Sequence, residues 1–322
     1  MDNKFVEVLE AYPFDTYHVS RTRGAFLLDT SDGIKLLKSF EGSEKKLLFE
    51  NEVTSYLLEH GFQNVDSFVK NKEGNLLTVS GQGEHYFVKN WFKAEAFEAK
   101  ENGKAIKAAG VLGRLHCVLR EMEVQEEIAK TEPIVASLEK HTKEIKKVKT
   151  YIRNKKQKNE FEIAMLESYD IFYEKAITSV EMLKKLEYEE KKVTHGSYTY
   201  HNVLFGNEGI AVVNFDKSSI GFQITDLYYF LRKLMEKNDW SIELGKAIIE
   251  EYEYFNPIHE KQRKLLLLLL IYPEKYWKIM NHYYNTKKCW VAVKSVEKLE
   301  VIRQQEHKKR AFLEEVFSLS FS

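Results

Sequence analysis

A loop beyond the middle of this 322-residue chain holds the side chains whose types and spacing could do chemistry. His195 opens the loop, Ser197 follows two positions later, Asn202 lies five positions after that, and the triplet Asn-Phe-Asp occupies 214–216. Amide and carboxylate oxygens are hard ligands of the kind that Mg²⁺ binds, usually with one or two carboxylates among them. A serine hydroxyl ionises far above neutral pH and is no resting general base. The segment therefore offers oxygen ligands but little negative charge.

A β-hairpin is expected to join the two halves of this polar segment. Its strands are predicted at 202–205 and 210–214, around the turn Gly-Asn-Glu-Gly at 206–209, because glycine and asparagine favour such turns. Taken alone, the segment could equally be an ordinary loop and hairpin. Its order and spacing with the other elements of the chain favour a functional site.

Together these residues resemble the H-G-D-x-x-x-x-N loop and the D-F-[DE] triplet of the aminoglycoside phosphotransferase and choline kinase-like families. In those families the loop aspartate accepts the proton of the substrate hydroxyl, while the asparagine and the first aspartate of the triplet hold magnesium. The resemblance implies that His195 and Ser197 mark the catalytic position. It also implies that Asn202, Asn214 and Asp216 mark the metal position.

Both aspartates of the family motif are replaced here, one by Ser197 and the other by Asn214. The replacements remove two formal negative charges from the place where the metal would lie, and a positioned general base contributes about 10²–10⁴ in rate. We therefore expect a catalytically silenced site that binds ATP and magnesium weakly. The alternative is an active ATP-dependent small-molecule kinase with a rearranged metal site, in which Asp216 supplies the missing carboxylate.

The resemblance implies an α+β, two-lobed protein-kinase-like fold. A small antiparallel β lobe with one helix would span residues 1–93, and a larger, mostly helical lobe would span 94–322. Hydrophobic patterning agrees with this division. It predicts the β-rich segments 17–30, 33–40, 67–70, 75–79 and 85–92, the helices 44–60, 103–119 and 160–188, and a charged C-terminal helix to about 317.

Two charged residues of the small lobe are the candidates that the resemblance implies for the cofactor phosphates. Lys38, near the end of its strand, would contact the phosphates, with Lys35 as the second choice. Glu52 on the following helix would pair with that lysine, in preference to Glu50. The ordinary alternative is that these side chains are simply solvated.

Trp91 is the candidate for contact with the adenine ring. It belongs to the hinge that the resemblance places around 89–93, at the end of an aromatic strand. The aromatic side chains of that strand could equally be part of the core.

Asp226 stands at the start of the segment ITDLYYFLRKLME, whose apolar spacing is typical of a helix. Its carboxylate could cap that helix, which contributes about 1 kcal/mol. In the resembling families this aspartate also supports the backbone of the catalytic loop. We therefore expect a structural role for Asp226.

The composition gives no global charge bias. Lys plus Arg and Asp plus Glu both total 49, so attraction to nucleic acid or to a membrane surface is not indicated. The longest apolar run, 265–272, is far shorter than the ~20 residues that span a bilayer, and the N-terminal residues lack the pattern of a secretory signal. We therefore expect neither a membrane nor a nucleic-acid partner.

One segment departs from this balance. Residues 139–158 include nine Lys or Arg against two Glu. The ordinary interpretation is a solvated helix face or a loop. The alternative is a surface that contacts an anionic partner.

Three segments resemble the spore coat protein family typified by CotS, a branch of the phosphotransferase-like superfamily. They are YTYHNVLF at 198–205, the stretch 214–237, and PEKYWKIMNHYYNTKK at 273–288. The likeness extends over nearly the whole chain. It implies synthesis in the mother-cell cytoplasm of a spore-forming bacterium, deposition in the spore coat, and other coat proteins as partners. No motif identifies a small-molecule substrate.

Overall fold

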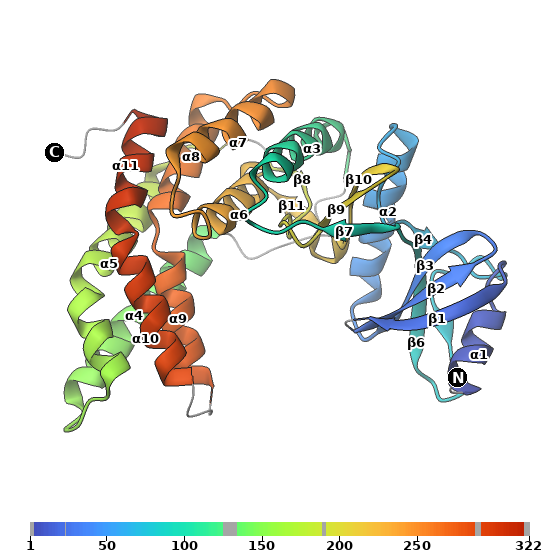
Figure 1. Cartoon of the computed structure of the whole chain (residues 1–322), viewed down its shortest axis with the longest axis horizontal. Helices are drawn as coiled ribbons and strands as arrows, with labels where there is room; N and C mark the ends of the chain where they lie inside the picture. Colours follow the sequence, from blue (N-terminus) through green and yellow to red (C-terminus); the bar gives the residue numbers. More distant parts are fainter. Residues whose placement is uncertain (1–2, 23, 125–133, 189–190, 287–290, 319–322) are drawn as a thin grey trace. The chain divides into compact units, whose positions relative to one another are not determined.

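The computed structural model describes residues 3–22, 24–124, 134–188, 191–286 and 291–318. Contacts divide the chain into two compact units, one comprising Met1–Lys130 and Lys191–Asp226 and the other comprising Thr131–Glu190 and Leu227–Ser322. Figure 1 labels their helices and strands. This division differs from the expected lobes 1–93 and 94–322, because the catalytic-like loop and its hairpin group with the N-terminal strands.

The first unit is built on an antiparallel sheet in the order β1-β2-β3-β6-β4, with β5 also pairing with β6. One face of this sheet packs against α1 through Leu28, Leu37 and Val88. The other face contacts α2 through Phe68 and Phe87. These elements are α1 (Asn3–Glu10), β1 (Thr16–Thr22), β2 (Ala25–Thr30), β3 (Gly33–Phe40), α2 (Glu44–Glu59), β4 (Phe68–Val69), β5 (Thr78–Val79) and β6 (His85–Asn90).

The register of β3 against β6 decides which lysines share a face of the sheet. Residues directly opposite each other on paired strands project from the same face, and successive residues alternate between faces. Leu36 lies opposite Lys89, and Lys38 lies opposite Phe87, so Lys38 and Lys89 belong to the face that contacts α2. Lys35 belongs to the face that contacts α1.

The hairpin of the catalytic-like loop joins the first unit through backbone pairing. Its strands β9 and β10 form a second sheet with β7 in the order β10-β9-β7, and β8 pairs with β11. Val65 bridges Val212, which ties the segment before β4 to β10. This backbone pairing explains why the hairpin belongs to the same compact unit as the N-terminal strands. The elements are β7 (Ala94–Ala96), α3 (Asn102–Arg120), β8 (Lys192–Thr194), β9 (Val203–Gly206), β10 (Gly209–Val212), the 3₁₀ turn η1 (Phe215–Lys217) and β11 (Ser219–Gly221).

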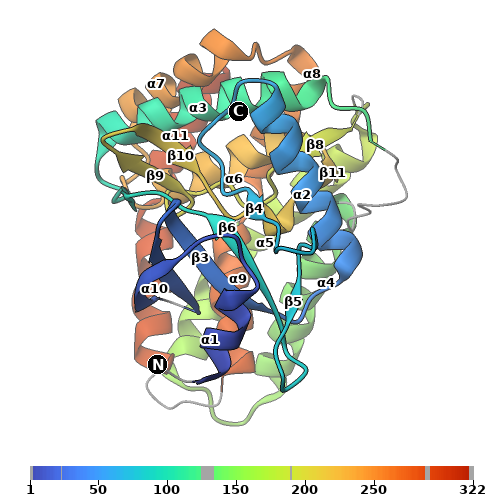
Figure 2. The ribbon, with the colours of Figure 1, turned by 90° about the vertical axis from the view of Figure 1, so that its right-hand side faces the viewer.

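The second unit is helical. Helices α4, α5, α9 and α10 pack side by side (Figures 1 and 2) around a core of aromatic and aliphatic side chains. The elements are α4 (Ile134–Asn154), α5 (Glu160–Lys185), α7 (Ile242–Phe255), α8 (Glu260–Ile271), α9 (Glu274–Asn285), α10 (Val291–Gln304) and α11 (Glu306–Phe317), with α6 (Ile224–Met235) entering from the first unit. Residues 287 and 288 of the CotS-like block lie outside the described residues.

The architecture is therefore α+β, with an N-terminal antiparallel sheet lobe and a larger helical lobe, as the sequence predicted. The expected strands 67–70 and 75–79 are shorter than predicted and reduce to β4 and β5. Among the described residues, no helix combines the length and the apolar character that crossing a bilayer requires.

Candidate phosphotransferase-like site

The loop after β8 makes a tight turn that only glycine fits. Gly196 has φ +73°, and a Cβ atom on it would lie 2.0 Å from the carbonyl oxygen of Lys217. Left-handed backbone is costly for residues with a side chain. The glycine of the motif is therefore required by the path of the chain, whatever chemistry the loop performs.

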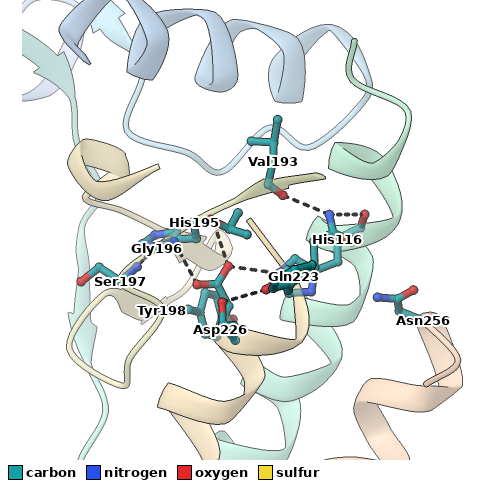
Figure 3. Close-up of polar contacts among 12 residues, drawn as sticks. His116, Val193, His195, Gly196, Ser197, Tyr198, Gln223, Asp226 and Asn256 are labelled. Atoms are coloured by element: carbon teal, nitrogen blue, oxygen red, sulfur yellow. Dashed lines mark hydrogen bonds and ion pairs between the residues drawn. The ribbon is translucent and has the colours of Figure 1, made fainter. Parts of the chain in front are cut away.

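Asp226 holds the backbone of this loop from the first turn of α6 (Figure 3). Its Oδ2 atom accepts the backbone N–H of His195 at 2.7 Å, and its Oδ1 atom accepts that of Gly196 at 2.9 Å. The Nε2 atom of His116 lies 3.2 Å from Oδ2, and all of these side chains are buried. Since α6 begins at Ile224, Asp226 lies inside the helix, and its carboxylate serves the loop instead of the helix terminus.

His195 is held as a neutral ring. Its Nδ1 atom accepts the backbone N–H of Ser197 at 3.1 Å, so the proton resides on Nε2, which donates to the carbonyl of Val213 at 3.2 Å. Burial lowers the pKa of the imidazole, and this outweighs the opposite effect of the Asp226 carboxylate. Both ring nitrogens are thereby committed to the protein. His195 orients the loop against the residue that follows β10, and its ring is not available for proton transfer.

The three positions of the degenerate motif form a chain of amide hydrogen bonds. The Nδ2 group of Asn202 donates to the carbonyl oxygen of Ser197 at 2.9 Å and lies 3.4 Å from its hydroxyl. The Nδ2 group of Asn214 donates to Oδ1 of Asn202 at 2.9 Å. The first bond fixes the orientation of the Asn202 amide, because a carbonyl can only accept. Asn202 must then present Oδ1 to Asn214, and Asn214 must present its NH₂ group.

This arrangement does not fit magnesium. The Asn202 oxygen that would ligate the metal already accepts a hydrogen bond from the residue that replaces the second ligand. Asp216, the predicted substitute carboxylate, is 51% exposed on η1 and lies 3.9 Å from the ammonium of Lys217. Among the described residues, no group of three or more His, Cys, Asp or Glu side chains could hold a metal ion.

The structure does not bring Lys38 and Glu52 together. Both side chains are exposed, and among the described residues no ion pair joins them. Instead Lys89 on β6 forms an ion pair with Glu50 of α2 and lies 3.0 Å from Oδ2 of Asp66. The predicted pairing is therefore corrected to Lys89 with Glu50. The second choice, Lys35, contacts Asp32 and Asn90 on the opposite face.

Sequence reasoning missed Lys89 and Asp66, although one signal was present. Lys89 lies two residues after Phe87, so in a strand the two side chains project from the same face. A lysine on such an aromatic face needs a buried counter-ion. The resemblance instead places Lys89 in the hinge, whereas β6 continues to Asn90. Asp66 carried no signal, since it is an isolated acid before a short strand whose partners come from distant parts of the chain.

Trp91 lies at the edge of a cavity of about 670 Å³ that is lined by β1, β2, β3 and the turn of the β9–β10 hairpin. Its backbone N–H donates to the carbonyl of Ile34 at 2.9 Å. The volume is within the range of small-molecule sites, which is about 300–1,000 Å³. Charged residues of both signs line it, namely Asp29, Asp32, Lys35, Lys93 and Glu208. Neither Lys38 nor Glu52 contributes to this cavity.

The chain resembles solved phosphotransferases over almost its whole length. An aminoglycoside phosphotransferase from Alicyclobacillus acidocaldarius superposes with a TM-score of 0.85 at 16% identity, covering 97% of this chain and 94% of that one. A spectinomycin phosphotransferase in complex with ADP and spectinomycin gives 0.67 at 15% identity, covering 94% and 98%. A choline kinase from Cryptosporidium parvum gives 0.57 at 13% identity, covering 98% and 97%. At these identities the likeness establishes the fold.

Family membership follows from the sequence model that spans both units. The model described as "Spore coat putative kinase YutH" matches residues 8–316. That range includes the degenerate loop, the triplet at 214–216 and the aromatic block that forms α9. The chain therefore belongs to the family of spore coat putative kinases described as YutH.

Proposed function

We propose that this protein is a catalytically silenced kinase-like protein of the spore coat, which acts in coat structure or binding. It would be made in the mother-cell cytoplasm and deposited in the coat with other coat proteins as partners. Family membership supports the location. The silenced state is supported by the site itself.

The hydrogen bond from Asn214 to Asn202 carries the proposal. In an active phosphotransferase the corresponding oxygens converge on magnesium, which neutralises the charge of the transferring phosphoryl group. Here the NH₂ group of Asn214 donates instead to the Oδ1 atom of Asn202 at 2.9 Å. Ser197 supplies no general base, and its carbonyl and hydroxyl both face the Asn202 amide. The missing carboxylates and the occupied Oδ1 atom of Asn202 both support the silenced state.

A binding role is supported by the basic face of α4. The helix is fixed from behind by α9, because Trp277 stacks on the ring of His141 and donates its indole N–H to Glu144 at 2.7 Å. Tyr272 donates its hydroxyl to the carbonyl of Leu138 at 3.1 Å. Trp277 of the block at 273–288 and the preceding Tyr272 thus hold this helix in place.

The outward side of α4 and the turn after it presents one sign of charge. Glu144 is engaged by Trp277, and Glu139 is bound by Lys143 and by Lys184 at 3.2 and 3.0 Å. The exposed cations are Lys140, Lys143, Lys146, Lys147, Arg153 and Lys156. This set, the basic face, would attract an anionic component of the coat. Lysine predominates over arginine, the better residue for bidentate phosphate recognition, which favours an acidic protein segment over a nucleic acid.

An active small-molecule kinase is the second candidate. The cavity beside Trp91 favours it, since its 670 Å³ could accommodate a ligand, and Asp216 is the nearest carboxylate in the triplet. The exposed position of Asp216 and its neighbour Lys217 weigh against metal binding.

Calorimetry with ATP, with and without magnesium, tests the proposed silencing. We expect weak or no binding of ATP and little effect of magnesium, because the carboxylates that attract the metal are missing. A micromolar affinity that depends strongly on magnesium would contradict the silenced site and favour the kinase.

A further inference from the structure

Three buried charges lie together between the sheet and α2. The side chains of Lys89, Glu50 and Asp66 are 4%, 8% and 1% exposed, and the ammonium contacts both carboxylates. Burial would lower the pKa of Lys89, but Asp66 and Glu50 outweigh it and raise that pKa. Burial raises the pKa of the Glu50 carboxyl, which Lys89 only partly offsets. The lysine therefore stays charged, with two acids sharing one cation.

One carboxylate oxygen connects this cluster to the degenerate motif. Oδ2 of Asp66 accepts the ammonium of Lys89 and also the backbone N–H of Asn214, each at 3.0 Å. Asn214 has left-handed backbone, with φ 67° and ψ 62°, and such a conformation must be held by its surroundings. The other oxygen, Oδ1, is buried and has no hydrogen-bond partner among the described residues.

We propose that the ammonium of Lys89 takes over, inside the protein, the charge-neutralising and organising role that a divalent cation has in active phosphotransferases. The ammonium neutralises the carboxylates of Glu50 and Asp66. Through Glu50 it holds α2 against the sheet, and through Asp66 it positions Asn214. This inference deepens the proposed silencing, on which it rests. In a silenced site this resident ammonium would supply the positive charge beside the triplet, in addition to the loss of the two aspartates.

Lys35 provides a matched control. It lies on the neighbouring strand, is 3% exposed, and has one carboxylate and one amide partner, Asp32 and Asn90. It belongs to the other face of the sheet, and its acid partner Asp32 is 75% exposed. Removal of Lys35 therefore takes away a buried ammonium without leaving two buried carboxylates together.

The experiment compares the wild type, Lys89→Met and Lys35→Met by thermal unfolding in a magnesium or manganese titration, without nucleotide. Both variants should melt lower, Lys89→Met by roughly 10 °C, because an acid pair is left buried without its cation. Millimolar divalent cation should then raise the Tm of Lys89→Met by about 3 °C or more. The wild type and Lys35→Met should not respond.

The outcomes separate this inference from the proposed silencing. If Lys89→Met is as insensitive to metal as Lys35→Met, Lys89 does not replace a cation, although the site could still be silent. If the wild type binds ATP with magnesium and Lys89→Met loses that binding, Lys89 is a phosphate-contacting lysine and both ideas fail.

A folding defect would also be informative. If Lys89→Met does not fold without metal, its refolding yield is measured with and without magnesium, and an unchanged yield overturns the inference. The double variant Glu50→Gln with Lys89→Met, which retains a single carboxylate, should fold and show no response to metal. A response of that variant equal to the response of Lys89→Met would likewise contradict the inference.

Discussion

The side-chain NH₂ group of Asn214 donates a hydrogen bond of 2.9 Å to the Oδ1 atom of Asn202. Each residue stands where a relative would use an oxygen to ligate magnesium, yet here one amide satisfies the other. The orientation of both amides follows from the bond between Asn202 and the Ser197 carbonyl. The Oδ1 atom of Asn202 is thereby already occupied, so building a metal site here would require changes at both ends of the amide chain.

The double variant Ser197→Asp with Asn214→Asp should recover magnesium-dependent binding of ATP, whereas either change alone should do little. A metal without the base leaves the acceptor unactivated, and a base without the metal leaves the phosphate charge unneutralised, so the effects do not add. At ATP about 100-fold above Kd, the gain in unfolding free energy would be about 2.7 kcal/mol. Thermal shift with ATP and magnesium measures it. A folded double variant without any such gain would show that the site has diverged beyond these two residues.

Gly196→Ala should destabilise the first unit by roughly 3 kcal/mol or more, since the new methyl group meets the Lys217 carbonyl at 2.0 Å in addition to the left-handed strain. Gly74→Ala is the control, because Gly74 also has positive φ, at +85°, but no atom within 4 Å of its would-be Cβ. It should cost only the backbone strain of about 1–2 kcal/mol. Urea unfolding compares the two. Equal losses would mean that the loop relaxes away from Lys217.

Replacement of Lys140, Lys146 and Lys147 by Ser should weaken association with an acidic coat component without unfolding the protein. All three are exposed on α4, whereas Lys149 is left in place because it binds Asp170 and covers the ring of Tyr169. Binding by the wild type should fall steeply with salt, because exposed charges are screened beyond about 8–10 Å at physiological ionic strength.

The matched control for the basic face replaces the exposed Lys45, Lys46 and Lys70 of the first unit by Ser. It makes the same change in net charge on residues that do not belong to α4. A poly-glutamate probe should bind the control variant as it binds the wild type, and it should bind the α4 variant more weakly. If it binds both equally, or if single-stranded nucleic acid or anionic vesicles bind better than poly-glutamate, the basic face is not a site for acidic protein segments.

Glu274 should make the second unit sensitive to acid. Burial would raise the pKa of its carboxyl, but His141, Lys278 and Arg232 outweigh this and lower it to about 2. A depressed acid adds stability that is fully present above its unfolded pKa near 4.5 and is lost as the pH falls towards 2. The contribution is about 3 kcal/mol. Glu274→Gln should therefore be less stable at pH 7 and lose less between pH 5 and pH 2, as followed by denaturant unfolding.

Much of the fold could be predicted because it depends on local patterns. Alternating apolar residues indicated the strands, and the helix expected at 44–60 is α2, which ends one residue earlier. The sequence pattern favours Glu52 over Glu50, because polar residues lie close together in α2 and the pattern does not show which of them faces the core. Glu50 is buried between Phe49 and Val53, whereas Glu52, two residues further and about 200° around the helix, is exposed.

The lysine was missed for a different reason. Strand alternation correctly places Lys38 on the face towards α2, but it does not tell which lysine of that face reaches the helix. That depends on the cross-strand neighbour, and the neighbour of Leu36 on β6 is Lys89. Asp66, which completes the cluster, is brought there by the bridge between Val65 and Val212. Contacts between segments so distant in sequence have no local signature.

The tight turn at Gly196 also bears on how such chains are recognised. The carbonyl of Lys217 leaves no room for a side chain at position 196, and the Asp226 carboxylate accepts the backbone N–H groups of His195 and Gly196. Selection for folding alone would therefore retain Gly196 and Asp226, whether or not the protein catalyses a reaction. A sequence search that relies on these residues therefore does not separate active enzymes from inactive relatives. Positions 197 and 214, where the resembling families have their aspartates, carry more information about activity, because this fold forms without a carboxylate at either one.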